Sequence, residues 1–121
     1  MWKRNIKSFR YAFNGLYDLF SNQPNALIHL FVMGVVVVAG FFFSISMLEW
    51  CAVSLAIAIV LAAEAFNTAL EYLTDLVSPG FHPLAGRTKD VAAAGVLIAA
   101  FGASAVGMIV FLPKILALFN A

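Results

Sequence analysis

The sequence predicts an all-α membrane protein in which an N-terminal amphipathic surface helix precedes three transmembrane helices. Hydrophobic residues fill 64% of the 121 positions, and the mean hydropathy is +0.98, well above what soluble domains show. Short segments rich in turn-forming residues separate three long apolar runs. The length leaves room for one domain, residues 1–121.

Residues 2–21 are expected to form a helix in the membrane interface. Its large apolar residues recur at alternating spacings of four and three, as one face of a helix requires: Trp2, Ile6, Phe9, Phe13, Leu16 and Phe20. A neighbouring polar stripe holds Lys3, Lys7, Arg10 and Asn14. Aromatic rings would enter the acyl region while the cations stay near lipid phosphates. Packing against the protein's own helices would give the same pattern, and both can hold.

The first transmembrane span is predicted at about residues 26–43. Pro24 breaks the preceding helix, and Asn22 or Asn25 can cap the next one. His29 falls in the first turn of this span, where a capping or interfacial role is commoner than a ligand role. We therefore treat His29 only as a possible neighbour of the site.

The second span is predicted at about residues 49–77, after a short external turn at residues 44–48. It contains no Pro or Gly and would be ~43 Å long, which exceeds the ~30 Å hydrocarbon core. Its second half should therefore extend through the cytoplasmic interface.

A loop is predicted at residues 78–88, and the third span at about residues 89–112, where Pro113 would bend or end it. Small residues recur every four positions on this span and allow close helix approach: Gly95, Ala99, Ala103 and Gly107. Three thin spans cannot readily enclose a polar site, so we expect a homo-oligomer.

The basic residues predict the topology. All seven except Lys114 lie before the first span or between the second and third. The positive-inside rule then places the N-terminus and the second loop in the cytoplasm. The net charge of +1 gives no indication of a nucleic-acid partner, and none is expected.

A polar stripe on the second span marks the candidate site. At ~100° per residue, one side of the helix carries Glu64, Asn67, Glu71 and Asp75, with Thr68 beside them. Charge in a membrane is costly unless it is used. Such a stripe can bind Mg²⁺, supply a general base or relay protons. A polar contact between helices of the oligomer is the structural alternative.

The loop and the start of the third span favour phosphoryl transfer. They add glycines for close approach and polar or charged groups for phosphate: Gly80, His82, Gly86, Arg87, Lys89 and Asp90. The sequence has no G-x-x-x-x-G-K-[ST] loop and no protein-kinase signature. A nucleotide site here would therefore be of another kind.

The pattern E-A-x-N-T-A-[IL]-E-x-x-x-D from Glu64, followed by H-x-x-x-G-R-x-K-D from His82, resembles the bacterial diacylglycerol kinase and undecaprenol kinase family. K-S-F-R-Y-A-F-N-G-L, beginning at Lys7, fits the family's surface helix. The resemblance implies a homotrimeric lipid kinase of the bacterial inner (cytoplasmic) membrane, with sites between neighbouring subunits at the cytoplasmic interface. It implies ATP and Mg²⁺ as cofactors and a lipid alcohol, undecaprenol or diacylglycerol, as substrate.

By position, the resemblance also implies roles for single residues. Glu64 would deprotonate the lipid hydroxyl, Glu71 would bind the metal, and Asn67 would lie beside both. The nucleotide side of the site would be formed by Arg4, Tyr11, Asp75, Gly80, His82, Lys89 and Asp90.

Gln23 is the main departure from the family pattern, which usually has a metal-binding glutamate there in E-x-N-x-[RK]-I-H. Leu27 likewise replaces the basic residue. Glutamine still offers a carbonyl oxygen to Mg²⁺ but removes a negative charge. We expect reduced but real activity; the alternative is a catalytically impaired membrane protein of the same fold. An ion-coupled transporter is disfavoured because no span is broken.

Overall fold

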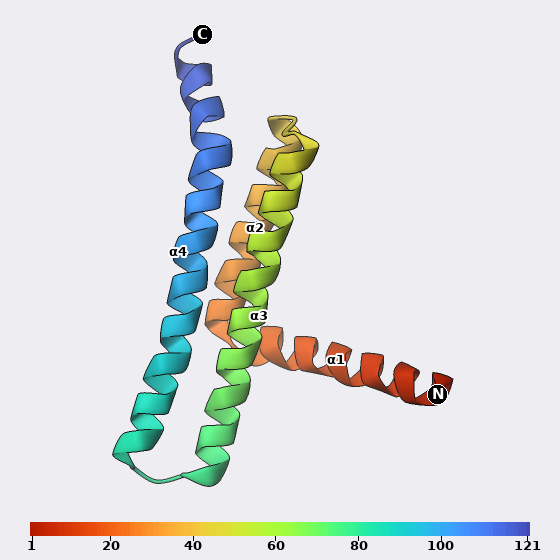
Figure 1. The fold of residues 1–121 in the computed structure, drawn as a ribbon, viewed down its shortest axis with the longest axis vertical. Coiled ribbons are helices and arrows are strands. Elements are labelled where there is room, and N and C mark those ends of the chain that lie inside the picture. The colour runs from red at the N-terminus through yellow and green to blue at the C-terminus, as the bar shows by residue number, and fades with distance from the viewer.

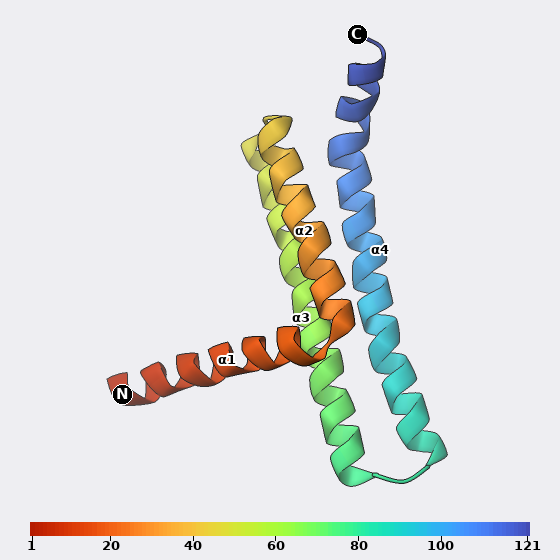
Figure 2. The ribbon, with the colours of Figure 1, turned by 180° about the vertical axis from the view of Figure 1, so that it is seen from behind.

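The computed structural model describes residues 1–121 and contains four helices and no strands. These are α1 (Trp2–Asn22), α2 (Pro24–Phe42), α3 (Met47–Val77) and α4 (Pro83–Phe119). The last three run side by side, and α1 projects away from them (Figure 1). Seen from behind, α2 covers much of α3 (Figure 2). Helices α2, α3 and α4 are long and apolar enough to cross a membrane, so the predicted all-α membrane class is confirmed.

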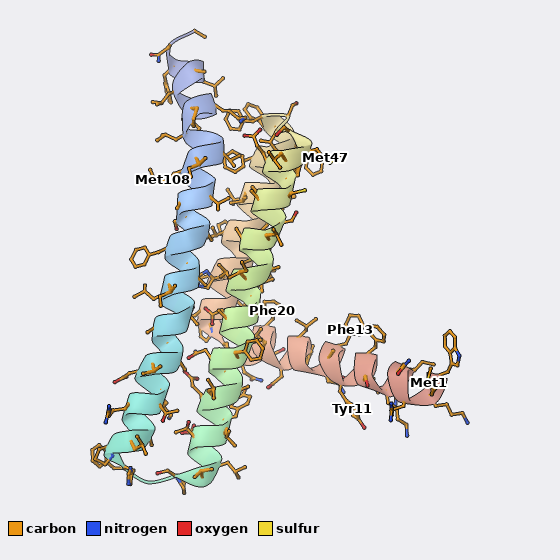
Figure 3. All side chains as sticks on the ribbon, in the orientation of Figure 1. Met1, Tyr11, Phe13, Phe20, Met47 and Met108 are labelled. Atoms are coloured by element: carbon orange, nitrogen blue, oxygen red, sulfur yellow. The ribbon has the colours of Figure 1, made fainter.

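A sharp corner at Gln23 separates α1 from α2. Its extended backbone (φ −118°, ψ 103°) ends α1, and Pro24 opens α2, where a missing N–H breaks no helical bond. The corner lets the last turns of α1 pack against α3 around Thr68 and Tyr72. Tyr11 and Phe13 point to opposite sides of α1, Tyr11 towards the side of the α3–α4 loop (Figure 3). Placement of α1 in a membrane interface stays a prediction.

A tight turn at residues 43–46 joins α2 to α3. Ser46 and Glu49 form a capping box: Ser46 Oγ accepts from the Glu49 N–H at 3.2 Å, and the Glu49 carboxylate accepts from the Ser46 N–H at 2.9 Å. The Trp50 ring packs directly on Gly40, where an added Cβ would lie 2.5 Å from Trp50 Cη2. This close contact fixes the α2–α3 hairpin at its closed end.

Half of the buried apolar residues form one cluster at this same end of the bundle, which contains Ile45, Val53, Val110 and Phe111. Beside it, Lys114 Nζ lies 2.6 Å from Glu49 Oε2 and joins α4 to α3. Only 11 of the 121 residues are buried, so most apolar side chains are exposed in the single chain. Those faces are available to lipid or to neighbouring subunits, and the predicted trimer stays a prediction.

Helix α4 is longer than the predicted third span. His82 Nδ1 accepts from the Leu84 N–H at 3.1 Å, and Pro83 occupies the first turn, which tolerates proline. The loop is therefore confined to residues 78–82, and the prediction of a loop over residues 83–88, including Gly86 and Arg87, is wrong. Pro113 does not end the helix, which continues to Phe119. An apolar surrounding favours continued internal bonding of the backbone.

Candidate functional site

Glu64 is a buried carboxylate in the middle of α3. Its Oε1 lies 3.1 Å from Nε2 of His29, near the start of α2, and their side chains are 5% and 27% exposed. Burying a carboxylate without a partner is costly, and His29 is the only side chain that pairs with it. The His29–Glu64 pair is thus a polar contact between the beginning of α2 and the middle of α3.

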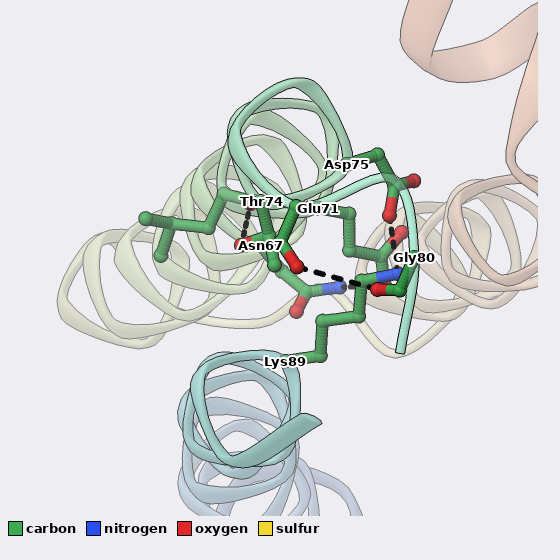
Figure 4. Close-up of polar contacts among 8 residues, drawn as sticks. Asn67, Glu71, Thr74, Asp75, Gly80 and Lys89 are labelled. Carbon is green, nitrogen blue, oxygen red and sulfur yellow. Dashed lines mark hydrogen bonds and ion pairs between the residues drawn. The ribbon is translucent and has the colours of Figure 1, made fainter. Parts of the chain in front are cut away.

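Asn67 and Glu71 continue the polar stripe along α3 towards the loop (Figure 4). Asn67 Nδ2 donates to Glu71 Oε1 at 3.4 Å, a long and weak hydrogen bond. Asn67 Oδ1 and Thr68 Oγ1 are buried and have no hydrogen-bond partner. Unpaired buried polar atoms are unusual in folded proteins, so both oxygens retain unused hydrogen-bonding capacity.

Asp75 and Lys89 join the end of α3 to the start of α4 through 2.6 Å between Oδ1 and Nζ (Figure 4). Their side chains are 62% and 41% exposed, so solvent screens the pair and either partner can exchange it for another ion. Asp90 follows and is exposed. The predicted phosphate-side lysine is therefore accessible and lies on the loop side of Glu71.

The loop at residues 78–82 is shaped by local hydrogen bonds. Ser78 Oγ donates to the Gly80 carbonyl at 3.2 Å. His82 uses Nδ1 to cap α4, which leaves Nε2 without a hydrogen-bond partner. Both predicted loop residues are exposed at the same end of the molecule as Lys89.

A groove of about 570 Å³ lies between α3 and α4 and connects the stripe to the loop side. Asn67 lines it from α3, and Arg87 and Thr88 line it from α4, among mainly apolar side chains. Arg87 belongs to α4 and not to the loop, and it borders the same groove as Asn67.

Gln23 lies at the α1–α2 corner, close to Tyr72, which Asp18 also approaches. Tyr72 follows Glu71 in sequence but lines the α1 side of α3, so the corner reaches the level of Glu71 without pairing with it. Arg4 and Tyr11 are exposed on the projecting part of α1, and their side chains make no polar contact with α3 or α4. The single chain does not bring these two residues to the stripe.

The residues around Glu71 fit a magnesium ion that is shared with phosphate and water. No three His, Cys, Asp or Glu side chains converge in the chain. Mg²⁺ commonly takes only one or two carboxylates and completes its shell with waters and substrate phosphates. Glu71 and the unpaired Asn67 Oδ1, one turn apart, are oxygen donors of this kind. The assigned roles of all these residues stay predictions.

Three residues of this region were not predicted as site residues. His29 was considered a neighbour only, although the structure pairs it with Glu64. No sequence pattern marks Asp18 or Tyr72 as a site residue. Tyr72 lies off the stripe, and Asp18 lies on α1, about one turn before the Gln23 corner.

Comparison with known proteins gives one consistent result. The model of the prokaryotic diacylglycerol kinase family matches residues 10–111. The undecaprenol kinase of Bacillus subtilis is 34% identical over 112 residues, which cover 93% of this chain and 91% of that protein. The diacylglycerol kinase of Synechocystis is 38% identical over 114 residues, which cover 93% of this chain and 65% of that protein. The diacylglycerol kinase of Haemophilus influenzae is 30% identical over 94 residues, which cover 78% of this chain and 80% of that protein. The resemblance inferred from the motifs is confirmed.

Proposed function

This chain belongs to the prokaryotic diacylglycerol kinase family of lipid kinases, and from that premise we propose that it transfers the γ-phosphate of ATP to the hydroxyl of a membrane lipid alcohol with the help of Mg²⁺. The names of its relatives supply two candidate lipids, undecaprenol and diacylglycerol. The reaction would take place at the cytoplasmic face of the bacterial inner membrane. The N-terminus would be cytoplasmic, as the distribution of basic residues indicates.

The buried Glu64 carboxylate carries this proposal. It lies among mainly apolar residues of α3, and His29 contacts only its Oε1. Oε2 is left to accept the hydroxyl proton as the lipid oxygen bonds to the γ-phosphorus and the bond from that phosphorus to the leaving ADP oxygen breaks. The proton therefore ends on Glu64, and the products are the lipid phosphate and ADP.

The loop side of the stripe would hold the phosphates. Lys89 would exchange Asp75 for phosphate oxygens, because their exposed ion pair is weakly held. Arg87, which borders the groove, would add positive charge, and the exposed Asp90 and His82 would contribute at the loop side. Mg²⁺, when bound, would neutralise charge that develops on the phosphates. Glu71 and Asn67 Oδ1 would hold it, with Gln23 nearby.

A trimer would complete the site. Arg4 and Tyr11 lie too far out on α1 to serve the stripe of their own chain, and Tyr11 points towards the loop side (Figure 3). A neighbouring subunit placed against the open α3–α4 face would bring such residues to the nucleotide. The exposed apolar faces of all three long helices support an assembly of this kind.

Undecaprenol is the lipid that we propose first, because the match covers 91% of the Bacillus subtilis undecaprenol kinase but 65% of the Synechocystis diacylglycerol kinase. The test is phosphate transfer from [γ-³²P]ATP in mixed micelles that contain either lipid. Labelling of undecaprenol well above diacylglycerol supports the assignment, and the reverse order assigns diacylglycerol. If neither lipid is labelled and ATP binds weakly, the impaired-protein alternative replaces the proposal.

A further inference from the structure

We propose that His29 is a positioning residue for Glu64, and this inference rests on the proposed function. Nε2 of the His29 imidazole lies 3.1 Å from Glu64 Oε1, so the ring holds the carboxylate through this polar contact. That contact would fix the carboxylate and leave Oε2 for the lipid hydroxyl. His29 touches neither substrate in this scheme and acts only through Glu64.

No other side chain pairs with the Glu64 carboxylate in the structure. The nearest amide on the stripe, Asn67 Nδ2, donates to Glu71 instead. The Thr68 hydroxyl is buried without a hydrogen-bond partner. The His29–Glu64 contact is also the only side-chain hydrogen bond or ion pair between α2 and α3. Without His29, the buried carboxylate would lose the one side chain that pairs with it in the structure.

The surroundings of His29 also offer no competing partner. Its ring borders a cavity of about 320 Å³ between α2, α3 and α4, whose walls are almost entirely aliphatic, for example Val32, Val60 and Ala100. Ser104 is the one other polar side chain in that lining, and its hydroxyl donates to the Ala100 carbonyl at 2.8 Å. Glu64 is therefore the group that decides the orientation of the His29 ring.

The position of His29 along α2 is itself well fixed. Pro24 and the extended Gln23 begin the helix just before it, and Ala26, on the intervening turn, is completely buried. A donor placed on such a rigid segment restricts the carboxylate more strongly than one on a flexible loop. Misplacing a reacting group by about 1 Å can lower a rate about 100-fold, so the effect on turnover should be large.

Two amide substitutions test the role because they differ only in the length of the side chain that carries the amide. In His29→Gln the side-chain amide reaches the position of the histidine Nε2, whereas in His29→Asn it reaches only that of Nδ1. We expect His29→Gln to keep kcat within about threefold of the wild type. We expect His29→Asn to lower kcat by about 10- to 100-fold while the KM for ATP stays unchanged.

The measurement is lipid phosphorylation by purified wild type and both variants, with elution volume and thermal midpoint recorded for each. Equal kcat values for the two variants, whether both normal or both reduced, would overturn the positioning role. A general structural or polar effect would not depend on how far the side-chain amide extends from the backbone. Failure of the wild type to phosphorylate any lipid would instead overturn the proposed function, and it would be seen before the variants are compared.

Discussion

Lys89 of α4 and Asp75 of α3 meet across the hairpin that joins the two helices, with 2.6 Å between Nζ and Oδ1 (Figure 4). Both side chains are largely open to solvent, and exposed ion pairs of this kind add little to stability. We therefore expect the pair to have a role other than stabilising the fold. We infer that Asp75 keeps the lysine extended over the end of the stripe until a nucleotide phosphate replaces it.

Replacing Lys89 by Met, which keeps the length of the side chain but not its charge, should raise the KM for ATP about tenfold, because a charge-assisted hydrogen bond to phosphate is lost. The thermal midpoint should stay unchanged, since the ion pair is exposed. Initial rates over a range of ATP concentrations, together with a thermal melt, give both values. A lower midpoint with an unaltered KM would show that Lys89 is only a structural link between α3 and α4.

Gln23→Glu should raise turnover several-fold when Mg²⁺ is limiting and have little effect when it is saturating, because a carboxylate adds an anionic oxygen for the metal. Asp18 and Tyr72 lie close to this corner, so the new carboxylate would also experience repulsion that a bound cation relieves. Rates titrated with Mg²⁺ measure the effect. Asn25→Asp, which adds the same charge two residues further on, is the control and should not reproduce it. Equal Mg²⁺ curves for the wild type and Gln23→Glu would exclude Gln23 from the metal site.

Gly40→Ala should destabilise the protein by about 1–3 kcal/mol, because the added methyl group would overlap the Trp50 ring and force the α2–α3 hairpin apart. Gly34→Ala is the matched control in the same helix, since an added Cβ there meets no atom within 4 Å. Denaturation midpoints in detergent compare the two variants. If Gly34→Ala is as harmful as Gly40→Ala, the Gly40–Trp50 contact does not determine the hairpin.

Much of the fold can be predicted from local patterns. The corner at Gln23 follows from Pro24, and the long uninterrupted α3 follows from the absence of Pro and Gly. The start of α4 was misplaced because Pro83 and Gly86 indicate a loop when they are considered alone. Proline is equally suited to a first helical turn, and the cap from His82 decides for the helix. At the other end of α4, Pro113 indicated a bend or an end of the span, but the helix continues to Phe119.

The polar stripe of the candidate site was predictable because it lies on one helix. Glu64, Asn67, Glu71 and Asp75 share a face because of the helical repeat alone. The pairing of His29 with Glu64 depends on how far α2 slides along α3, which no local pattern encodes. The approach of Asp18 to Tyr72 likewise depends on the angle at the Gln23 corner. The places of Arg4 and Tyr11 depend on neighbouring subunits, beyond what one chain determines.

The most direct test of the central claim is the transfer of radiolabelled γ-phosphate to lipid by the wild type and by Glu64→Gln, assayed with Mg²⁺ present and after its removal by chelation. Glutamine keeps the size of the side chain and can still bond to His29, so the fold should persist while the base is lost. Glu49→Gln, the same change in the first turn of α3, is the control and should remain active. We predict Mg²⁺-dependent labelling by the wild type and a loss of at least about 100-fold in Glu64→Gln. Labelling by Glu64→Gln at the rate of the wild type would contradict the claim.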